Sequence, residues 1–124
     1  MLARAHQGIV FVVENDDLSR ESTTATFEQA GYLVLPARDG EEALSRMRGV
    51  NFPAVAIVDL RMPGMAGRDL IATMRDDEEL AHIPIVVLSA YARDALVPGA
   101  ARIFHKPCEA RELVEVVGEL SGNL

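Results

Sequence analysis

Four groups of polar residues in this sequence each follow a short apolar segment and could do chemistry together. They are the acidic run Glu14–Asp16, Asp59, Ser89 and Lys106. A carboxylate such as Asp59 can act as a nucleophile or as an oxygen ligand for a hard cation. Clustered carboxylates repel one another unless a cation intervenes, which favours bound Mg²⁺. A lysine and a serine hydroxyl beside the metal would suit a transferring phosphoryl group, because that step depends on positioning and charge neutralisation.

The elements that would position these residues follow from the apolar pattern. Short apolar segments predict five strands of a parallel sheet, at residues 8–13, 32–35, 54–58, 84–88 and, more weakly, 101–104. Apolar residues at helical spacing predict helices at residues 19–30, 39–49 and 109–120, and another that ends near residue 75. Leu18 and Phe27 are expected to face inward from the first helix. Residues 91–100 have room for about two helical turns.

Strand and helix patterns alternate five times, which predicts right-handed crossovers between parallel strands. The expected fold is α/β: a three-layer sandwich of a parallel sheet with helices on both faces. The length of 124 residues predicts a single domain, residues 1–124. If strands one, three, four and five are neighbours, the four polar groups meet at the carboxyl edge of the sheet, where ligands bind in such folds.

Each of these residues also has an ordinary structural interpretation. Ser89 taken alone is typical of a turn, and Lys106 of a solvated surface. Asp59 and the acidic run are each compatible with capping a helix. The combination favours chemistry, because all of these residues would otherwise meet one edge of the sheet by accident.

Composition excludes several classes of function. The net charge of −7 argues against direct binding of nucleic acid or anionic membranes, which require a basic surface. Cys108 is the only cysteine, so an intramolecular disulfide and a multi-cysteine metal site are excluded, and oxygen ligands favour Mg²⁺ over Zn²⁺. No apolar run approaches about 18 residues, the length that spans a membrane. With no signal-peptide pattern at the start, we expect a cytoplasmic protein.

The sequence resembles the receiver domains of two-component response regulators over essentially its whole length. The resemblance rests on VVEND at residues 12–16, DLRMPGMAG at 59–67, LSA at 88–90 and HKP at 105–107. It implies a flavodoxin-like fold with strand order 2-1-3-4-5. It also implies Mg²⁺-dependent transfer of a phosphoryl group from a phosphohistidine, followed by conformational switching. The implied partners are a histidine kinase or histidine phosphotransfer protein and a downstream protein target.

The resemblance assigns roles to individual residues. Asp59 matches the phosphoacceptor, Ser89 the switch hydroxyl and Lys106 the phosphate-binding lysine. The implied metal ligands are Glu14, Asn15, Asp59 and the backbone carbonyl of Arg61. The peptide bond between Lys106 and Pro107 is expected to be cis, as proline tolerates.

Asn15 departs from the family pattern, in which aspartate is most common at this position. An amide oxygen can still bind a metal, but the missing charge should weaken Mg²⁺ binding. Asp16 or Glu14 could compensate for it.

Two further departures concern signal output. Ile103 occupies the usual position of an aromatic switch residue, so a rotating ring is absent there. Ser89 and Lys106 are 17 positions apart, which is shorter than the common family spacing by more than a helical turn. The fourth of five helices, within residues 91–100, should therefore be short, and output through its surface is not expected.

Three other functions compete with a phosphoaccepting signalling module that is not a turnover enzyme. A phosphorylation-independent interaction module is favoured by Asn15 and by the short segment at residues 91–100, and opposed by the combination of Asp59, Ser89 and Lys106. A haloacid-dehalogenase-like phosphatase would need a second acid two residues after Asp59, where Arg61 stands. A flavin carrier is disfavoured, because the acidic run would repel a cofactor phosphate.

Overall fold

The computed structural model describes residues 8–50, 54–61, 67–91 and 97–122. Its centre is a five-stranded parallel sheet in the order β2-β1-β3-β4-β5. The strands are β1 (Ile9–Val13), β2 (Leu33–Ala37), β3 (Ala54–Asp59), β4 (Ile85–Ser89) and β5 (Arg102–His105). The helices are α1 (Asp17–Gln29), α2 (Gly40–Met47), α3 (Gly67–Asp76) and α4 (Ala110–Ser121). The expected α/β fold and strand order are confirmed.

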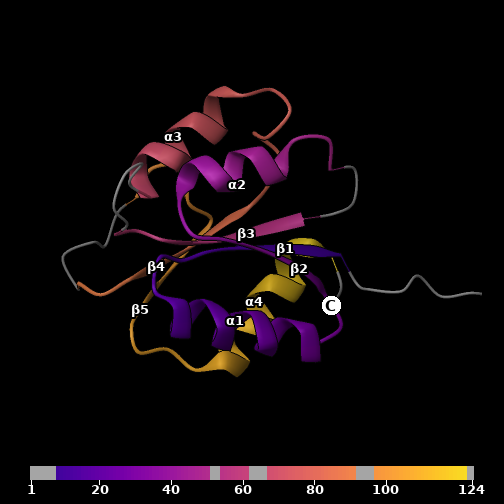
Figure 1. Ribbon diagram of the computed structural model, residues 1–124, viewed down its shortest axis with the longest axis vertical. Helices are drawn as coiled ribbons and strands as arrows, with labels where there is room; N and C mark the ends of the chain where they lie inside the picture. Colours follow the sequence, from indigo (N-terminus) through magenta and orange to yellow (C-terminus); the bar gives the residue numbers. More distant parts are fainter. Residues whose placement is uncertain (1–7, 51–53, 62–66, 92–96, 123–124) are drawn as a thin grey trace, which may run out of the picture.

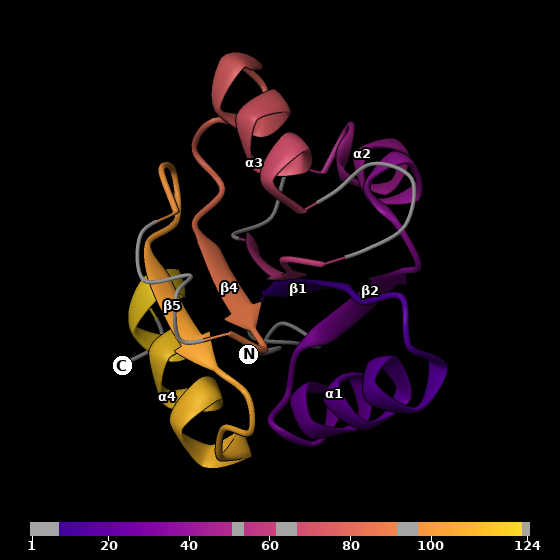
Figure 2. The ribbon, with the colours of Figure 1, turned by 90° about the vertical axis from the view of Figure 1, so that its left-hand side faces the viewer.

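The sheet separates two apolar layers, as Figures 1 and 2 show, with α2 and α3 on one face and α1 and α4 on the other. All residues of β1, β3 and β4 are buried, because both faces of these central strands are covered. Alternate residues of each strand therefore belong to different layers. Phe11 packs with Met47 and Ile71 on the α2–α3 face, and Val12 packs with Phe27 and Val117 on the α1–α4 face.

The first two helices begin at aspartate caps. The carboxylate of Asp16 accepts a hydrogen bond of 2.8 Å from the amide of Ser19, so α1 begins at Asp17, two residues earlier than predicted. Asp39 caps α2 in the same way through the amide of Glu42, as the sequence pattern indicated. The prediction that Leu18 faces inward was wrong. Its side chain, in the first turn of α1, is 77% exposed, and Phe27, which was also expected to face inward, is buried in the last turn.

The end of the connection between β4 and β5, at residues 97–100, lies on the α2–α3 side of the sheet. The short helix expected there falls largely on residues 92–96, which are outside the described residues. The following residues form a turn in which Val97 is buried and Gly99 has a φ of +91°. Gly99 lies so close to Ile71 and Arg75 of α3 that an added Cβ would come within 3.0 Å of each. The end of this connection is therefore packed tightly on α3.

Candidate functional site

The parallel register brings the ends of four strands to one edge of the sheet. Val13 pairs with Val58, Asp59 with Leu88, and Ser89 with His105. Glu14 follows β1, Asp59 and Ser89 end β3 and β4, and Lys106 follows β5. The predicted site residues therefore share the carboxyl edge of the sheet, as the strand order requires.

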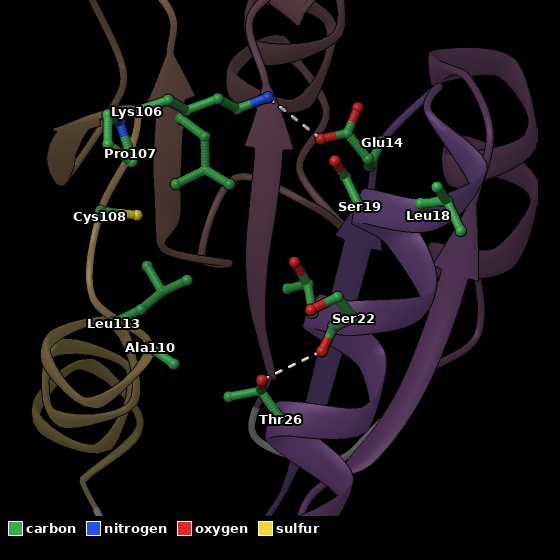
Figure 3. A pocket seen from close by; sticks show the side chains of 12 residues that line it. Glu14, Leu18, Ser19, Ser22, Thr26, Lys106, Pro107, Cys108, Ala110 and Leu113 are labelled. Carbon is green, nitrogen blue, oxygen red and sulfur yellow. Dashed lines mark hydrogen bonds and ion pairs between the residues drawn. The ribbon is translucent and has the colours of Figure 1, made fainter.

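Lys106 is the centre of the site. Its ammonium group lies 3.2 Å from Glu14 Oε1 and 3.3 Å from Asp59 Oδ2. Both carboxylates are largely withdrawn from water, with Glu14 5% and Asp59 8% exposed. Figure 3 shows the lysine side chain extending along the edge toward Glu14. One cation thus bridges two buried anions that come from separate strands.

Burial and proximity shift the pKa values of this group. Burial is the main cause that raises the pKa of Glu14, and its hydrogen bond with Asp59 adds to the rise. Burial alone would lower the pKa of Lys106, but the two carboxylates outweigh it and raise that pKa. The lysine therefore stays charged, and the two carboxylates compete for it.

The acidic run is held in place by its own hydrogen bonds. Glu14 uses its second oxygen, Oε2, to accept a bond of 3.1 Å from the amide of Asp16. Asp16 is engaged in capping α1, and the hydrogen bond from the Ser19 amide lowers the pKa of its carboxyl group. Asn15, between them, is exposed at the edge. The ordinary capping interpretation is thus correct for Asp16. Glu14 and Asn15 remain as the residues of the run whose side chains are candidates for metal binding.

A second set of contacts joins the loops that follow β3 and β4. The amide of Arg61 donates to Asp59 Oδ1 at 3.1 Å, and the Arg61 guanidinium carbon lies 4.6 Å from the centre of the Tyr91 ring. This distance is that of a cation–π contact. Ser89 is fully buried, and its hydroxyl oxygen both donates to the carbonyl and accepts from the amide of Tyr91, each at 3.1 Å. Tyr91 thus links Ser89 to Arg61, whose amide contacts Asp59.

Two residues of the site were not anticipated from the sequence. Tyr91 was missed because a residue that follows an apolar strand is usually part of a turn, and a tyrosine there does not indicate a functional site. Arg20 lies six positions after Glu14, and its guanidinium donates to the carbonyl oxygens of Glu14 and Asn15. Contacts to backbone carbonyls do not depend on which side chains stand at those positions, so a sequence motif does not reveal them.

The donors at this edge suit a hard cation. Two carboxylates, the Asn15 amide and a backbone carbonyl at Arg61 are all oxygen ligands of the kind that Mg²⁺ prefers. Among the described residues, no group of three or more histidine, cysteine or acidic side chains gathers in metal-binding proximity. The chemistry of the donors therefore fits Mg²⁺, with fewer anionic ligands than a tight site would have.

A groove of about 580 Å³ opens beside the site, between α1 and the start of α4. Figure 3 shows its walls. Glu14 and Lys106 lie at one end, and the remaining lining is nearly all uncharged: Leu18, Ser19, Ser22, Thr23, Thr26, Leu88, Pro107, Cys108, Ala110 and Leu113. Burial raises the pKa of the Cys108 thiol. The Lys106–Pro107 peptide bond in this wall is cis, as expected.

Comparisons with known proteins agree with this architecture. The family model of the response regulator receiver domain matches residues 10–118. The polar-differentiation response regulator DivK of Brucella ovis is 32% identical over 101 residues, which are 82% of this chain and 79% of DivK. The structure of the response regulator TrrA from Thermotoga maritima in complex with Mg²⁺-BeF aligns with a TM-score of 0.80 and 28% identity, covering 90% of this chain and 97% of TrrA.

A more distant structure matches the fold equally well. The receiver domain of a sensor histidine kinase from Pseudomonas aeruginosa, with a magnesium ion coordinated in its active-site cleft, aligns with a TM-score of 0.85 at 22% identity. The alignment covers 93% of this chain and 98% of that domain. No helix in the described part of the chain has the length and apolar character needed to cross a membrane.

Proposed function

Because the chain belongs to the response regulator receiver domain family, we propose that Asp59 accepts a phosphoryl group from a phosphohistidine in a Mg²⁺-dependent reaction. A carboxylate oxygen of Asp59 forms the new P–O bond while the P–N bond breaks and its electron pair stays on the imidazole. The observation that carries the proposal is the Lys106 ammonium group, 3.3 Å from Asp59 among the ends of β1, β3 and β5. A cation in that place neutralises charge on the transferring group.

The remaining site residues have roles that follow from their positions. Glu14, Asn15, Asp59 and the Arg61 carbonyl would hold Mg²⁺, which when bound neutralises phosphoryl oxygens. The Mg²⁺-BeF complex of the relative TrrA supports this assignment. Lys106 holds a phosphoryl oxygen, and it is already oriented by its contacts with Glu14 and Asp59.

Signal output would begin at Ser89. To reach a phosphoryl group on Asp59, its hydroxyl must leave the carbonyl of Tyr91, to which it donates at 3.1 Å. Ile103 is half-buried on β5 and offers no ring to follow this movement. The change is therefore expressed in the loops around Asp59 and Tyr91. Amide exchange with and without beryllofluoride should show the largest differences at Ser89–Tyr91 and Asp59–Arg61, and differences confined to β5 would contradict this route.

Labelling by acetyl phosphate tests the phosphoacceptor directly. With Mg²⁺, the intact mass of the wild type should rise by one phosphoryl group, and Asp59→Asn should gain none. Asp76→Asn, at an exposed aspartate that ends α3, is the matched control and should label like the wild type. Equal labelling of Asp59→Asn would refute the assignment.

Receiver domains interact with histidine kinases and with downstream targets, and we propose that the α1–α4 groove receives the helix that bears the phosphohistidine. The groove leads from α1 directly to Glu14 and Lys106. Leu18 lines the groove and offers an exposed apolar contact to an incoming helix. A helix laid in the groove would therefore bring its histidine toward Asp59.

Cys108 makes this docking surface testable, because it is the only cysteine and lines the groove. A bulky maleimide on Cys108 should slow phosphotransfer from a phosphorylated histidine phosphotransfer protein and leave labelling by acetyl phosphate unchanged. Cys108→Ala treated in the same way is the control. If the modified protein accepts the phosphoryl group from the protein donor at the wild-type rate, the donor docks elsewhere.

One observation favours a second function, a receiver fold that interacts without being phosphorylated. Asn15 removes a carboxylate from the site, and Asp16 is committed to the cap of α1 and does not replace it. The acetyl phosphate experiment separates the two functions, because an interaction module would remain unlabelled at any Mg²⁺ concentration.

A further inference from the structure

Arg20 connects α1 to the loop that carries the expected metal ligands. Its Nη1 donates to the carbonyl oxygen of Glu14 at 3.0 Å and to that of Asn15 at 3.3 Å. Its Nη2 forms an ion pair with Asp17, which is 80% exposed. The Arg20 side chain itself is only 16% exposed, so it is held against the protein along most of its length.

This arrangement restrains the backbone at two consecutive carbonyls. The amide of Glu14 is also bound, at 3.0 Å, to the carbonyl of Ala37 on β2. Glu14 and Asn15 are thus tied to the sheet on one side and to α1 on the other. A planar guanidinium is suited to this task, because its donors have a fixed geometry.

We propose that Arg20 is a positioning residue of the phosphorylation site, which holds the Glu14–Asn15 backbone so that both side chains offer their oxygens to Mg²⁺. The inference rests on the proposed function, since it concerns the same metal. Groups that orient metal ligands without touching the metal typically change its affinity by about 10- to 100-fold when they are removed. In this chain the orientation of the ligands by Arg20 matters more for Mg²⁺ affinity, because Asn15 supplies no charge.

A purely electrostatic role for Arg20 predicts the opposite result. A guanidinium beside a cation site repels the metal, so its removal would tighten Mg²⁺ binding. The direction of the change in affinity therefore distinguishes positioning from charge.

The experiment measures Mg²⁺ affinity by titration calorimetry, without any phosphoryl donor. Arg20→Met should weaken the affinity by about tenfold. Arg20→Lys, which keeps the charge but lacks the planar fork, should fall between Arg20→Met and the wild type. Arg46→Met is the matched control, because Arg46 also pairs with an acidic residue of its own helix, Glu42 at 3.9 Å, and lies on α2.

A second measurement separates local positioning from a general loss of stability. Faster exchange is expected in the Arg20 variants at the amide of Asp16, which donates to Glu14 Oε2. The amide of Phe27, in the last turn of the same helix, should exchange at the wild-type rate. If Arg20→Met does not fold, the Mg²⁺ affinity of Arg20→Lys and the exchange rate of its Asp16 amide test the same proposal.

The outcomes are distinct. Weaker Mg²⁺ binding in both Arg20 variants, with Arg46→Met unchanged, supports the proposal. Unchanged or tighter binding overturns it, and so does a wild type that binds no Mg²⁺ at millimolar concentration. Failure of Asp59 as phosphoacceptor would appear instead as equal labelling of Asp59→Asn, which leaves the affinity measurements valid.

Discussion

At the scale of single residues, the site depends on one ammonium group shared by two buried carboxylates. Lys106 is the only lysine among 124 residues, and all other cationic side chains except the histidines are arginines. A lysine presents a compact charge on a flexible stem, so it can turn from one carboxylate toward a phosphoryl oxygen. The same contact that orients the lysine before phosphorylation therefore also keeps Glu14 and Asp59 from repelling each other.

Lys106→Met should lower the free energy of unfolding by about 1–3 kcal/mol in the absence of metal, because two buried acceptors lose their partner. Added Mg²⁺ should stabilise this variant more than the wild type, since the metal neutralises the same carboxylates. Urea denaturation with and without Mg²⁺ measures both effects. Arg102→Met is the control, because it removes only an exposed pair between β5 and Glu119 of α4, and it should change the stability little.

Asn15→Asp should tighten Mg²⁺ binding by about tenfold, because a third carboxylate ligand, beside Glu14 and Asp59, at about 4 Å adds more than 1 kcal/mol of attraction near a protein surface. Without metal the variant should be less stable than the wild type, since the new carboxylate repels Glu14 and Asp59. Gln29→Glu adds the same charge at an exposed position near the end of α1 and is the control. Unchanged affinity would mean that Asn15 does not contact the metal.

At the scale of elements, the position of Asp59 depends on how α3 begins. The amide of Gly67 donates to the carbonyl of Leu60 at 3.2 Å. An added Cβ at Gly67 would lie 2.6 Å from the carbonyl oxygen of Asp59 and 2.8 Å from the Cα of Leu60. These neighbours are backbone atoms, so the end of β3 would have to move. Glycine at this position lets α3 approach the strand that ends at Asp59.

Gly67→Ala should therefore lower stability by about 1–3 kcal/mol through overpacking and also slow labelling by acetyl phosphate. Gly49→Ala is the matched control. Gly49 has a φ of +79° with no atom within 4 Å of an added Cβ, so alanine there meets only conformational strain. It should lower stability and leave labelling unchanged. If Gly67→Ala and Gly49→Ala lose the same stability and are labelled by acetyl phosphate at the same rate, the movement of the end of β3 does not affect labelling, and the prediction is wrong.

The sequence predicted the elements better than their ends. Central strands such as β3 were evident because a strand covered on both faces is a continuous apolar run. The start of α1 was placed two residues too late, because the acidic run was considered as a possible cap without identifying which of its residues caps the helix, and that depends on where the chain turns. β2 continues beyond its predicted end at residue 35 through Pro36 to Ala37. An edge strand tolerates a proline, because one side of the strand needs no donor.

The same limits apply to the site. Strand ends and residue types predicted that Glu14, Asp59 and Lys106 would meet, since parallel strands end at one edge. Arg20 and Tyr91 act through backbone carbonyls, a backbone amide and a ring face. Those contacts depend on the path of the loops, which no spacing of side chains encodes.

At the scale of the whole molecule, two arginines fasten the α2–α3 layer to the loop before β4. Arg75 of α3 donates to the carbonyl oxygens of Ala81 and Ile83 in that loop. Arg48 follows α2 and contacts Asp77 at 2.7 Å and Glu79 at 3.3 Å, while the amide of Gly49 donates to Glu79 at 2.7 Å. The hydrogen bond from Arg48 lowers the pKa of Asp77, and the same pair raises the pKa of Arg48.

These pKa shifts predict a pH dependence of stability. A carboxyl group whose pKa is lowered by folding contributes stability above its unfolded pKa, about 4, and loses it as the pH falls through the folded value. Arg48→Met should therefore lose less stability than the wild type between about pH 5 and pH 3. Urea denaturation across this range measures the difference. Arg46→Met, on the same helix, should follow the wild-type profile, and a parallel profile for Arg48→Met would contradict the prediction.

The two edge strands of the sheet, β2 and β5, bear on the tendency of the protein to aggregate in concentrated solution. Strand borders with free amides invite other chains to add strands, which leads to fibrils. Pro36 has no amide to donate on β2, and β5 has only four residues, with Arg102 and His105 exposed at its two ends. Neither border is a good template for cross-chain pairing. Crowding should therefore not drive this chain to polymerise through the edges of its sheet.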